Sequence, residues 1–182
     1  MKPLDRYLSR ARIARGRPFV KPGDVVIDVG CADGSMFRAW QGLIGRGVGV
    51  DPALDRQVSG PNFELYPGSF PDAVPDDVQA DLITMFAVLE HIPPDRQARL
   101  AEAAARMLKP GGRIVLTVPS QRVDTILHVL GWLRLIDGIA VHEHYGFRPE
   151  VTPSIFPPPL FRLVQHRRFQ FGLNNLFVFE RA

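Results

Sequence analysis

The sequence predicts an open α/β sheet with helices on both faces, and three observations support that prediction. Residues 25–29 are apolar except at Asp28, which is typical of a parallel strand covered by helices on both sides. A turn with glycine at positions 30 and 34 follows at once. A second apolar stretch, residues 46–50, then ends in Asp51. A strand, a tight turn and an acid at the end of the next strand are typical of a site for a nucleoside-containing cofactor.

The turn and the acid each have a physical role in this prediction. Gly30 lets the chain leave the strand in a conformation that other residues resist, and it brings bare backbone close to a ligand. Gly34 lets the following helix pack closely, with its free N–H groups directed at the pocket. The carboxylate of Asp51 can accept hydrogen bonds from both hydroxyls of a ribose. Because the spacing is G-x-x-x-G rather than G-x-G-x-x-G, and because Asp33 would repel a diphosphate, the turn favours S-adenosylmethionine over NAD or FAD.

Several motifs, taken in order, resemble those of the class I S-adenosylmethionine-dependent methyltransferases. VIDVGCADG (26–34) resembles their first motif, and GVGVD (47–51) resembles the acidic end of their second strand. DLITMFAVLEHI (81–92) is similar to their fourth strand with the Leu-Glu-His tail of the small-molecule branch, and LKPGGRIVLTVP (108–119) to their fifth strand and the turn before it. The resemblance implies a Rossmann-like, seven-stranded, mostly parallel sheet in the order 3-2-1-4-5-7-6, with an antiparallel C-terminal hairpin at its edge.

The same resemblance implies which residues bind S-adenosylmethionine. Ala32 stands where the family usually has its middle glycine. Ser69 stands where the family often has an acid that meets the adenine amino group, so that contact is expected to fall to backbone and to Phe70. The implied cofactor-binding residues are Asp28, Gly30, Ala32, Gly34, Asp51, Pro52, Phe70 and Phe86.

Length and composition are those of one ordinary globular domain. The chain has 182 residues, of which 46% are hydrophobic and 23% charged, and we expect a single methyltransferase domain over residues 1–182. No apolar run approaches the roughly 20 residues that span a bilayer. The sequence begins without the apolar segment of a signal peptide, so a cytoplasmic location is expected. The lone cysteine, Cys31, excludes an internal disulfide and suits a reducing compartment.

The net charge of +3 is unevenly distributed, because basic residues precede the first strand. Two interpretations stay open. The basic segment can attract an anionic substrate or surface, or it is the solvated side of a helix whose Leu4, Leu8 and Ala11 face the sheet. Nucleic acid is not expected as a partner, since few aromatic residues interleave with the basic ones. The basic residues are Arg6, Arg10, Arg12, Arg15, Arg17 and Lys21.

Hydrophobic periodicity and helix breakers predict the remaining elements. Expected helices span residues 3–15, 34–42, 93–108 and 121–137, with a short helical stretch beginning at Pro52. Expected strands span 25–29, 46–50, 63–66, 81–86, 113–118, 167–171 and 175–180. Proline and glycine at 109–112 predict a sharp turn. The partly apolar, proline-bearing segment at about 120–160 is expected to form a lid-like insertion over the site.

Candidate catalytic residues follow the fourth strand and lie in the lid-like insertion. Glu90 and His91 stand at the carboxyl edge of the sheet, where ligands bind; the alternative is that Glu90 orients local backbone and His91 packs structurally. His142 and His144 alternate on one segment and so can face one pocket, where a histidine is the natural base near neutral pH. The alternative for this pair is ordinary loop polarity, and no metal is expected.

These residues predict transfer of a methyl group from S-adenosylmethionine to an oxygen or nitrogen of a small-molecule acceptor. Oxygen is slightly favoured, because the histidines of the lid-like insertion offer a base. A protein of the same fold that binds the cofactor without methyl transfer is one alternative. A small NAD-dependent oxidoreductase is another, although the missing third glycine and the missing Tyr-x-x-x-Lys pair count against it. The oligomeric state is not predicted.

Overall fold

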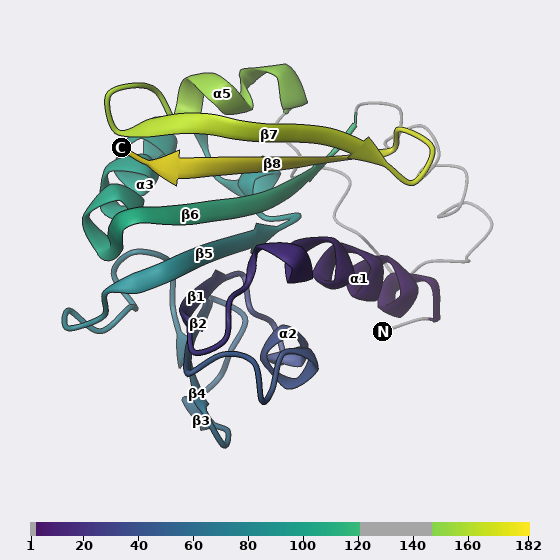
Figure 1. Ribbon diagram of the computed structural model, residues 1–182. Helices are drawn as coiled ribbons and strands as arrows, with labels where there is room; N and C mark the ends of the chain where they lie inside the picture. Colours follow the sequence, from purple (N-terminus) through teal and green to yellow (C-terminus); the bar gives the residue numbers. More distant parts are fainter. Residues whose placement is uncertain (1–2, 121–146) are drawn as a thin grey trace.

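The fold is a twisted sheet of eight strands with helices on both faces, as seen in a computed structural model that describes residues 3–120 and 147–182 (Figure 1). The strand order is β3-β4-β2-β1-β5-β6-β8-β7. Neighbours from β4 to β6 run parallel, whereas β3, β8 and β7 pair antiparallel with their neighbours. The strands are β1 (Val25–Val29), β2 (Arg46–Asp51), β3 (Val58–Ser59), β4 (Phe63–Pro67), β5 (Ala80–Phe86), β6 (Leu108–Pro119), β7 (Phe161–Phe169) and β8 (Asn174–Arg181).

This architecture confirms the predicted α/β fold with its antiparallel C-terminal hairpin. Without β3, the order of the strands is the predicted one. The predicted number of seven was one too low, because Val58 and Ser59 pair with Leu65 and Glu64 and extend the sheet beyond β4. Both added residues are exposed, so they lack the apolar alternation by which a strand is recognised in a sequence.

Helices cover the two faces of the sheet around separate apolar clusters. Ile13 of α1 (Pro3–Gly16) and Phe37 of α2 (Ser35–Ala39) pack on one face, together with Val26 of β1. Leu100 of α3 (Pro94–Met107) packs on the other face with Ile27, the next residue of β1. Because successive side chains of a strand point to opposite faces, one short apolar strand serves both clusters. The other helices of the described residues are the 3-10 helices η1 (Arg17–Phe19), η2 (Leu89–His91) and η4 (Pro149–Val151), and the short helix α5 (Thr152–Ile155).

Some predicted boundaries differ from the observed ones for local reasons. The helix expected at 34–42 is only α2, because the backbone turns after Trp40 and reaches a left-handed conformation at Gly42. No helical stretch begins at Pro52; Ala53 and Leu54 instead donate backbone hydrogen bonds to Asp51 and form a turn.

Strands β6 and β7 both begin earlier in the chain than predicted. Residues 109–112, expected to form a sharp turn, lie within β6. The pairing of β6 with β5 is irregular there, because Leu108 pairs with Ala80 and Arg113 pairs with Leu82. Strand β7 begins at Phe161 rather than at 167, because its pairing with β8 extends along the whole hairpin. Of the lid-like insertion, residues 121–146, with the helix expected at 121–137, lie outside the described residues. No helix in the described part of the chain is both long and apolar enough to cross a membrane.

Candidate functional site

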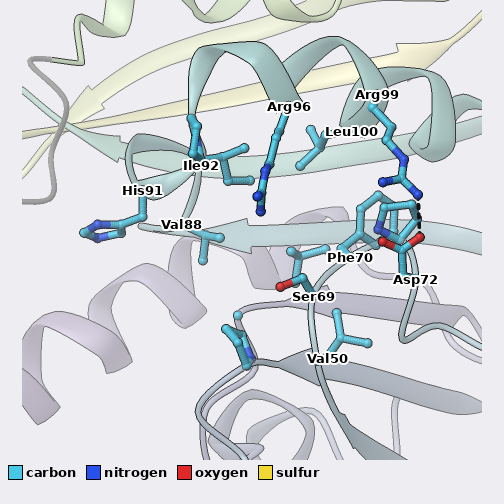
Figure 2. Close-up of a pocket in the computed structure, with 16 residues that line it drawn as sticks. Val50, Ser69, Phe70, Asp72, Val88, His91, Ile92, Arg96, Arg99 and Leu100 are labelled. Atoms are coloured by element: carbon cyan, nitrogen blue, oxygen red, sulfur yellow. Dashed lines mark hydrogen bonds and ion pairs between the residues drawn. The ribbon is translucent and has the colours of Figure 1, made fainter.

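A cleft of about 460 Å³ lies at the carboxyl ends of the parallel strands. This is the edge at which open α/β sheets bind ligands, and the volume is in the range of small-molecule pockets. Figure 2 shows its wall-forming residues: one side comes from the ends of β1 and β2, one from the segment after β4, and one from η2 and α3. The lining residues are Val29, Gly30, Val50, Pro52, Gly68, Ser69, Phe70, Pro71, Asp72, Val88, His91, Ile92, Pro93, Arg96, Arg99 and Leu100.

The loop that follows β1, residues 30–34, is hydrogen-bonded to the end of β2. The N–H groups of Gly30 and Cys31 both donate to the carbonyl of Val50, at 2.8 and 3.2 Å. The N–H of Ala32 donates to Oδ2 of Asp51 at 2.8 Å. Ala32 itself has a left-handed φ of 46°, at the position where the resembled motif usually has glycine. The 30–34 loop is therefore held in a strained but well-defined conformation beside the cleft.

At two positions of this loop, both the backbone conformation and the lack of room for a side chain require glycine. Gly30 has a φ of +76°, and a Cβ built on it would lie 2.4 Å from Cγ2 of Val88. Gly34 also has a φ of +76°, and its Cβ would lie 2.9 Å from Cδ1 of Leu65. A side chain at position 30 would press on the cleft wall, since Gly30 and Val88 both line the cleft. A side chain at position 34 would instead force α2 away from the sheet.

The carboxylate of Asp51 is fixed by two backbone donors. Oδ2 accepts from Ala32 N, and Oδ1 accepts from Ala53 N, each at 2.8 Å. A carboxylate has about four lone-pair positions, so two remain for ligand hydroxyls. The neighbouring Pro52 lines the cleft. This is the arrangement that a ribose would need: two acceptors held still, at the end of a strand that borders the cleft.

Asp28 lies beneath the loop and is 4% exposed. The hydroxyl of Thr84 donates to its Oδ1 at 2.6 Å. Burial raises the pKa of Asp28 to about 7, against the lowering effect of the Thr84 hydrogen bond and with a smaller raising effect from the charge of Asp51. The group therefore titrates near neutral pH, and a nearby ligand cation would favour its charged form.

The two predicted aromatic contacts lie in different places. Phe70 is partly buried and lines the cleft beside Ser69, whereas Phe86 packs in the other direction. The Phe86 ring meets Trp40 edge-on with centroids 6.2 Å apart, and a Cβ at Gly16 would lie 2.4 Å from the ring. The ring of Phe86 thus fills the space between the sheet and α1.

The candidate catalytic residues of the Leu-Glu-His tail form η2. His91 is exposed and lines the cleft, and Figure 2 shows its ring pointing away from Phe70 and Asp72. Glu90 is 3% exposed and does not line the cleft. His142 and His144 lie outside the described residues. Within residues 3–120 and 147–182, no group of three or more metal-ligating side chains is placed to hold an ion.

Helix α3 contributes cleft residues that the sequence interpretation missed. Arg96 extends from α3 toward Ser69, while Arg99 pairs with Asp72 at 2.6 Å (Figure 2). The sequence held part of the signal, since the apolar Leu100 follows Arg96 by one turn of the expected helix. The spacing relates Arg96 to Leu100, but the side of α3 that borders the cleft depends on how the helix packs on the sheet.

Comparisons with known proteins agree with this geometry. The chain matches the family described as "Methyltransferase domain" over residues 4–152. It is 31% identical to a ubiquinone biosynthesis O-methyltransferase of Idiomarina loihiensis over 149 residues, covering 72% of this chain and 57% of that protein. It is 30% identical to a ribosomal protein L11 methyltransferase of Burkholderia vietnamiensis over 140 residues, covering 70% of this chain and 42% of that protein. The chain thus spans about half the length of these curated relatives.

Among solved structures, a chain from the complex between the Haloferax volcanii Trm112 methyltransferase activator and a methyltransferase aligns with a TM-score of 0.68. Its sequence identity is 17%, and the alignment covers 100% of this chain and 99% of that one, so the likeness concerns the fold. The family match covers the glycine-bearing loop, the Asp51 strand end and the cleft between them. On this evidence the chain belongs to the class I S-adenosylmethionine-dependent methyltransferases.

Proposed function

We propose that this protein transfers a methyl group from S-adenosylmethionine to an oxygen or nitrogen of a small-molecule acceptor. The observation that carries the proposal is the bond from Ala32 N to Asp51 Oδ2, which joins the glycine loop to the acid at the end of β2. It leaves acceptor positions of the Asp51 carboxylate available beside a cleft of small-molecule size. The residues present fit the cofactor, because Gly30 lines the cleft without a side chain, so that a ligand can approach its backbone.

In this proposal Asp51 binds the ribose hydroxyls, and Pro52 and Phe70 contact the adenine side of the cleft. Asp28, buried under the loop, favours a positively charged ligand because a nearby cation would lower its pKa from about 7. Phe86 is left out of the proposed contacts, since its ring packs on Trp40.

The reaction needs little covalent chemistry from the protein. S-adenosylmethionine supplies, when bound, a methyl group on a sulfonium, which is already activated toward displacement. Held by Asp51, Pro52 and Phe70, the cofactor would give its methyl group to the acceptor oxygen or nitrogen, and S-adenosylhomocysteine would leave with the electron pair of the carbon–sulfur bond. The chain must align the acceptor, exclude water and accept the acceptor's proton.

The candidate proton acceptors are residues of η2 and the histidines of the lid-like insertion. His91 lies at the cleft, and an imidazole nitrogen can accept a proton, whereas Glu90 is buried. His142 and His144, predicted to face the acceptor from the lid-like insertion, stay a prediction. We therefore assign His91 the role of base at the cleft edge, with the lid histidines as the competing assignment.

Oxygen is the favoured acceptor atom. Relatives named ubiquinone biosynthesis O-methyltransferase support oxygen and a small molecule, whereas the relative named ribosomal protein L11 methyltransferase acts, by its name, on a protein. The cleft volume of about 460 Å³ also suits small ligands. A cytoplasmic location and a single domain with a lid-like insertion over residues 120–160 belong to the same proposal.

Calorimetric titration with S-adenosylhomocysteine tests the cofactor assignment. Asp51→Ala should weaken binding by about 1–3 kcal/mol, the usual cost of leaving polar groups without their partner. Asp55→Ala is the matched control, because Asp55 is an exposed carboxylate on the same segment. Equal affinity in the two folded variants would contradict the ribose role of Asp51.

A second measurement separates the enzyme from a binding protein of the same fold. Formation of S-adenosylhomocysteine is followed with a panel of phenols and amines. Turnover with any of them, reduced in His91→Ala, supports the proposal. Tight cofactor binding without turnover of any acceptor would favour the binding-protein alternative, and titration with NAD would test the oxidoreductase.

A further inference from the structure

A second groove lies between α1 and α2, on the face of the sheet opposite α3. Its volume is about 670 Å³, large enough for a small ligand. The groove is lined by Arg6, Ser9, Arg10, Ile13, Ala14, Arg17, Asp33, Ser35, Arg38, Ala39 and Trp40. None of these residues lines the cofactor cleft. The groove therefore needs an explanation of its own.

The walls of the groove carry an excess of positive charge. Arg6, Arg10 and Arg17 are exposed and form no ion pair with a carboxylate that the structure describes. The single acid of the lining, Asp33, is already engaged: Oδ1 accepts from Ser35 N at 3.0 Å, and Oδ2 pairs with Arg38 at 3.1 Å. Three guanidinium groups are thus left to face an anion.

The floor of the groove is apolar. Ile13 and Trp40 are buried core residues, 8% and 2% exposed, and their lining atoms belong to the apolar cluster of this face. Ala14 and Ala39 add small apolar surface on the two helices. A bare inorganic ion would make no use of such a floor, whereas the hydrocarbon part of a larger ligand can contact it.

We propose that this groove binds the phosphate group of an amphiphilic phosphomonoester, with Arg6, Arg10 and Arg17 on the phosphate and the Ile13–Trp40 floor under the apolar part. The planar guanidinium donates paired N–H groups that match phosphate oxygens, and several arginines together suit a dianion better than a carboxylate. This assignment also chooses between the two interpretations of the basic N-terminal segment: its arginines form a binding surface. It does not depend on the proposed methyl transfer.

Octyl phosphate is the probe, measured by calorimetry on the full chain at moderate salt. We expect binding that Arg10→Gln weakens roughly tenfold or more, the loss expected for a charge-assisted hydrogen bond, and that the triple variant Arg6→Gln/Arg10→Gln/Arg17→Gln abolishes. Arg106→Gln is the matched control: Arg106 is exposed on α3, which packs on the other face. Thermal unfolding of each variant checks that the fold is retained.

Three results would overturn the proposal. One is an equal affinity for octyl phosphate in Arg10→Gln, the triple variant and Arg106→Gln. Another is equal binding of octyl glucoside, which would assign the interaction to the floor alone. The third is competitive displacement of octyl phosphate by S-adenosylhomocysteine, which would place the phosphate in the cofactor cleft.

A vesicle arm distinguishes the two sources of such a phosphate. Binding to phosphatidylcholine vesicles that contain phosphatidic acid, lost in the triple variant, would identify a lipid as the source. Binding to octyl phosphate without vesicle binding would identify a soluble phosphomonoester. Failure of both probes would refute the site, and it would leave the test of Asp51 with S-adenosylhomocysteine unaffected.

Discussion

Adding a methyl group at Gly30 should destabilise the protein through two separable effects. The first is conformational, because Gly30 has a φ of +76° and a non-glycine residue there costs about 1–2 kcal/mol. The second is steric, because the new Cβ would lie 2.4 Å from Cγ2 of Val88, where carbon atoms prefer roughly 3.5–4.0 Å. Overpacking of this kind costs about 1–3 kcal/mol. Gly30→Ala should therefore lower the free energy of unfolding by about 2–5 kcal/mol.

A matched glycine isolates the steric part. Gly111 has a φ of +73°, close to that of Gly30, and its Cβ would meet no atom within 4 Å. Gly111→Ala should show the conformational cost alone, about 1–2 kcal/mol. Urea unfolding of both variants gives the difference between them. That difference should be about 1–3 kcal/mol, the contribution of the contact with Val88.

The double variant Gly30→Ala/Val88→Ala closes the cycle. Truncation of Val88 removes the clash but not the left-handed conformation, so the double variant should recover the steric part of the loss. A coupling energy of about 1–3 kcal/mol is expected from the four unfolding measurements. Affinity for S-adenosylhomocysteine should fall in Gly30→Ala, since both residues line the cleft. Equal losses in Gly30→Ala and Gly111→Ala, with no coupling to Val88, would refute this reasoning.

Three further predictions concern strain in the 30–34 loop and the charge of two aspartates of the sheet. Ala32→Gly should stabilise the protein by up to about 1 kcal/mol in urea unfolding, because relief of a left-handed φ of 46° outweighs the extra flexibility of glycine in the unfolded chain; a loss of stability would contradict the strain. Asp28 has its pKa raised from 3.8 to about 7, so the stability that its neutral form gives is fully present below pH 3.8 and is lost as the pH rises through 7. Asp28→Asn should therefore flatten the decline of unfolding free energy over this window, a decline of at most about 1.4 kcal/mol per pH unit; an unchanged slope would argue against the shift. For Asp81, burial acts to raise the pKa, but hydrogen bonds from Lys109 and from Val25 N outweigh it and lower the pKa. Its contribution is present above the unfolded pKa of 3.8 and lost as the pH falls through the folded value; the acid limb of the stability profile should accordingly be shallower in Asp81→Asn.

The sequence alone predicted the elements whose signal lies in their own residues. Strand β1 is a short apolar run that both faces of the sheet bury, and its end is fixed by Gly30. Strand β7 offered no such signal over its first half: Leu163 and Val164 are each 42% exposed, and the strand exists because β8 pairs with it. Long-range pairing of this kind has no counterpart in the hydrophobic period of the strand itself.

The same distinction applies to the site. Gly30 and Asp51 could be predicted as partners because loop and strand end are brought together by the parallel pairing of β1 with β2. Arg96 could not be placed at the cleft without knowing how α3 lies over the sheet. The direction of the Phe86 ring likewise depends on where α1 and Trp40 lie. Residues that a neighbouring strand positions were thus predictable, and residues whose direction depends on a helix packing across the sheet were not.

The two proposed sites lie on opposite sides of the 30–34 loop. Its first residues turn toward β2, where Ala32 N meets Asp51 and Gly30 borders the cofactor cleft. Asp33 turns the other way, where it pairs with Arg38 and lines the groove between the helices. The sequence interpretation gave Asp33 the task of repelling a diphosphate from the cofactor turn. In the structure the charge of Asp33 lies in the groove and partly neutralises its arginines, so Asp33→Asn should strengthen binding in the groove and leave affinity for S-adenosylhomocysteine unchanged.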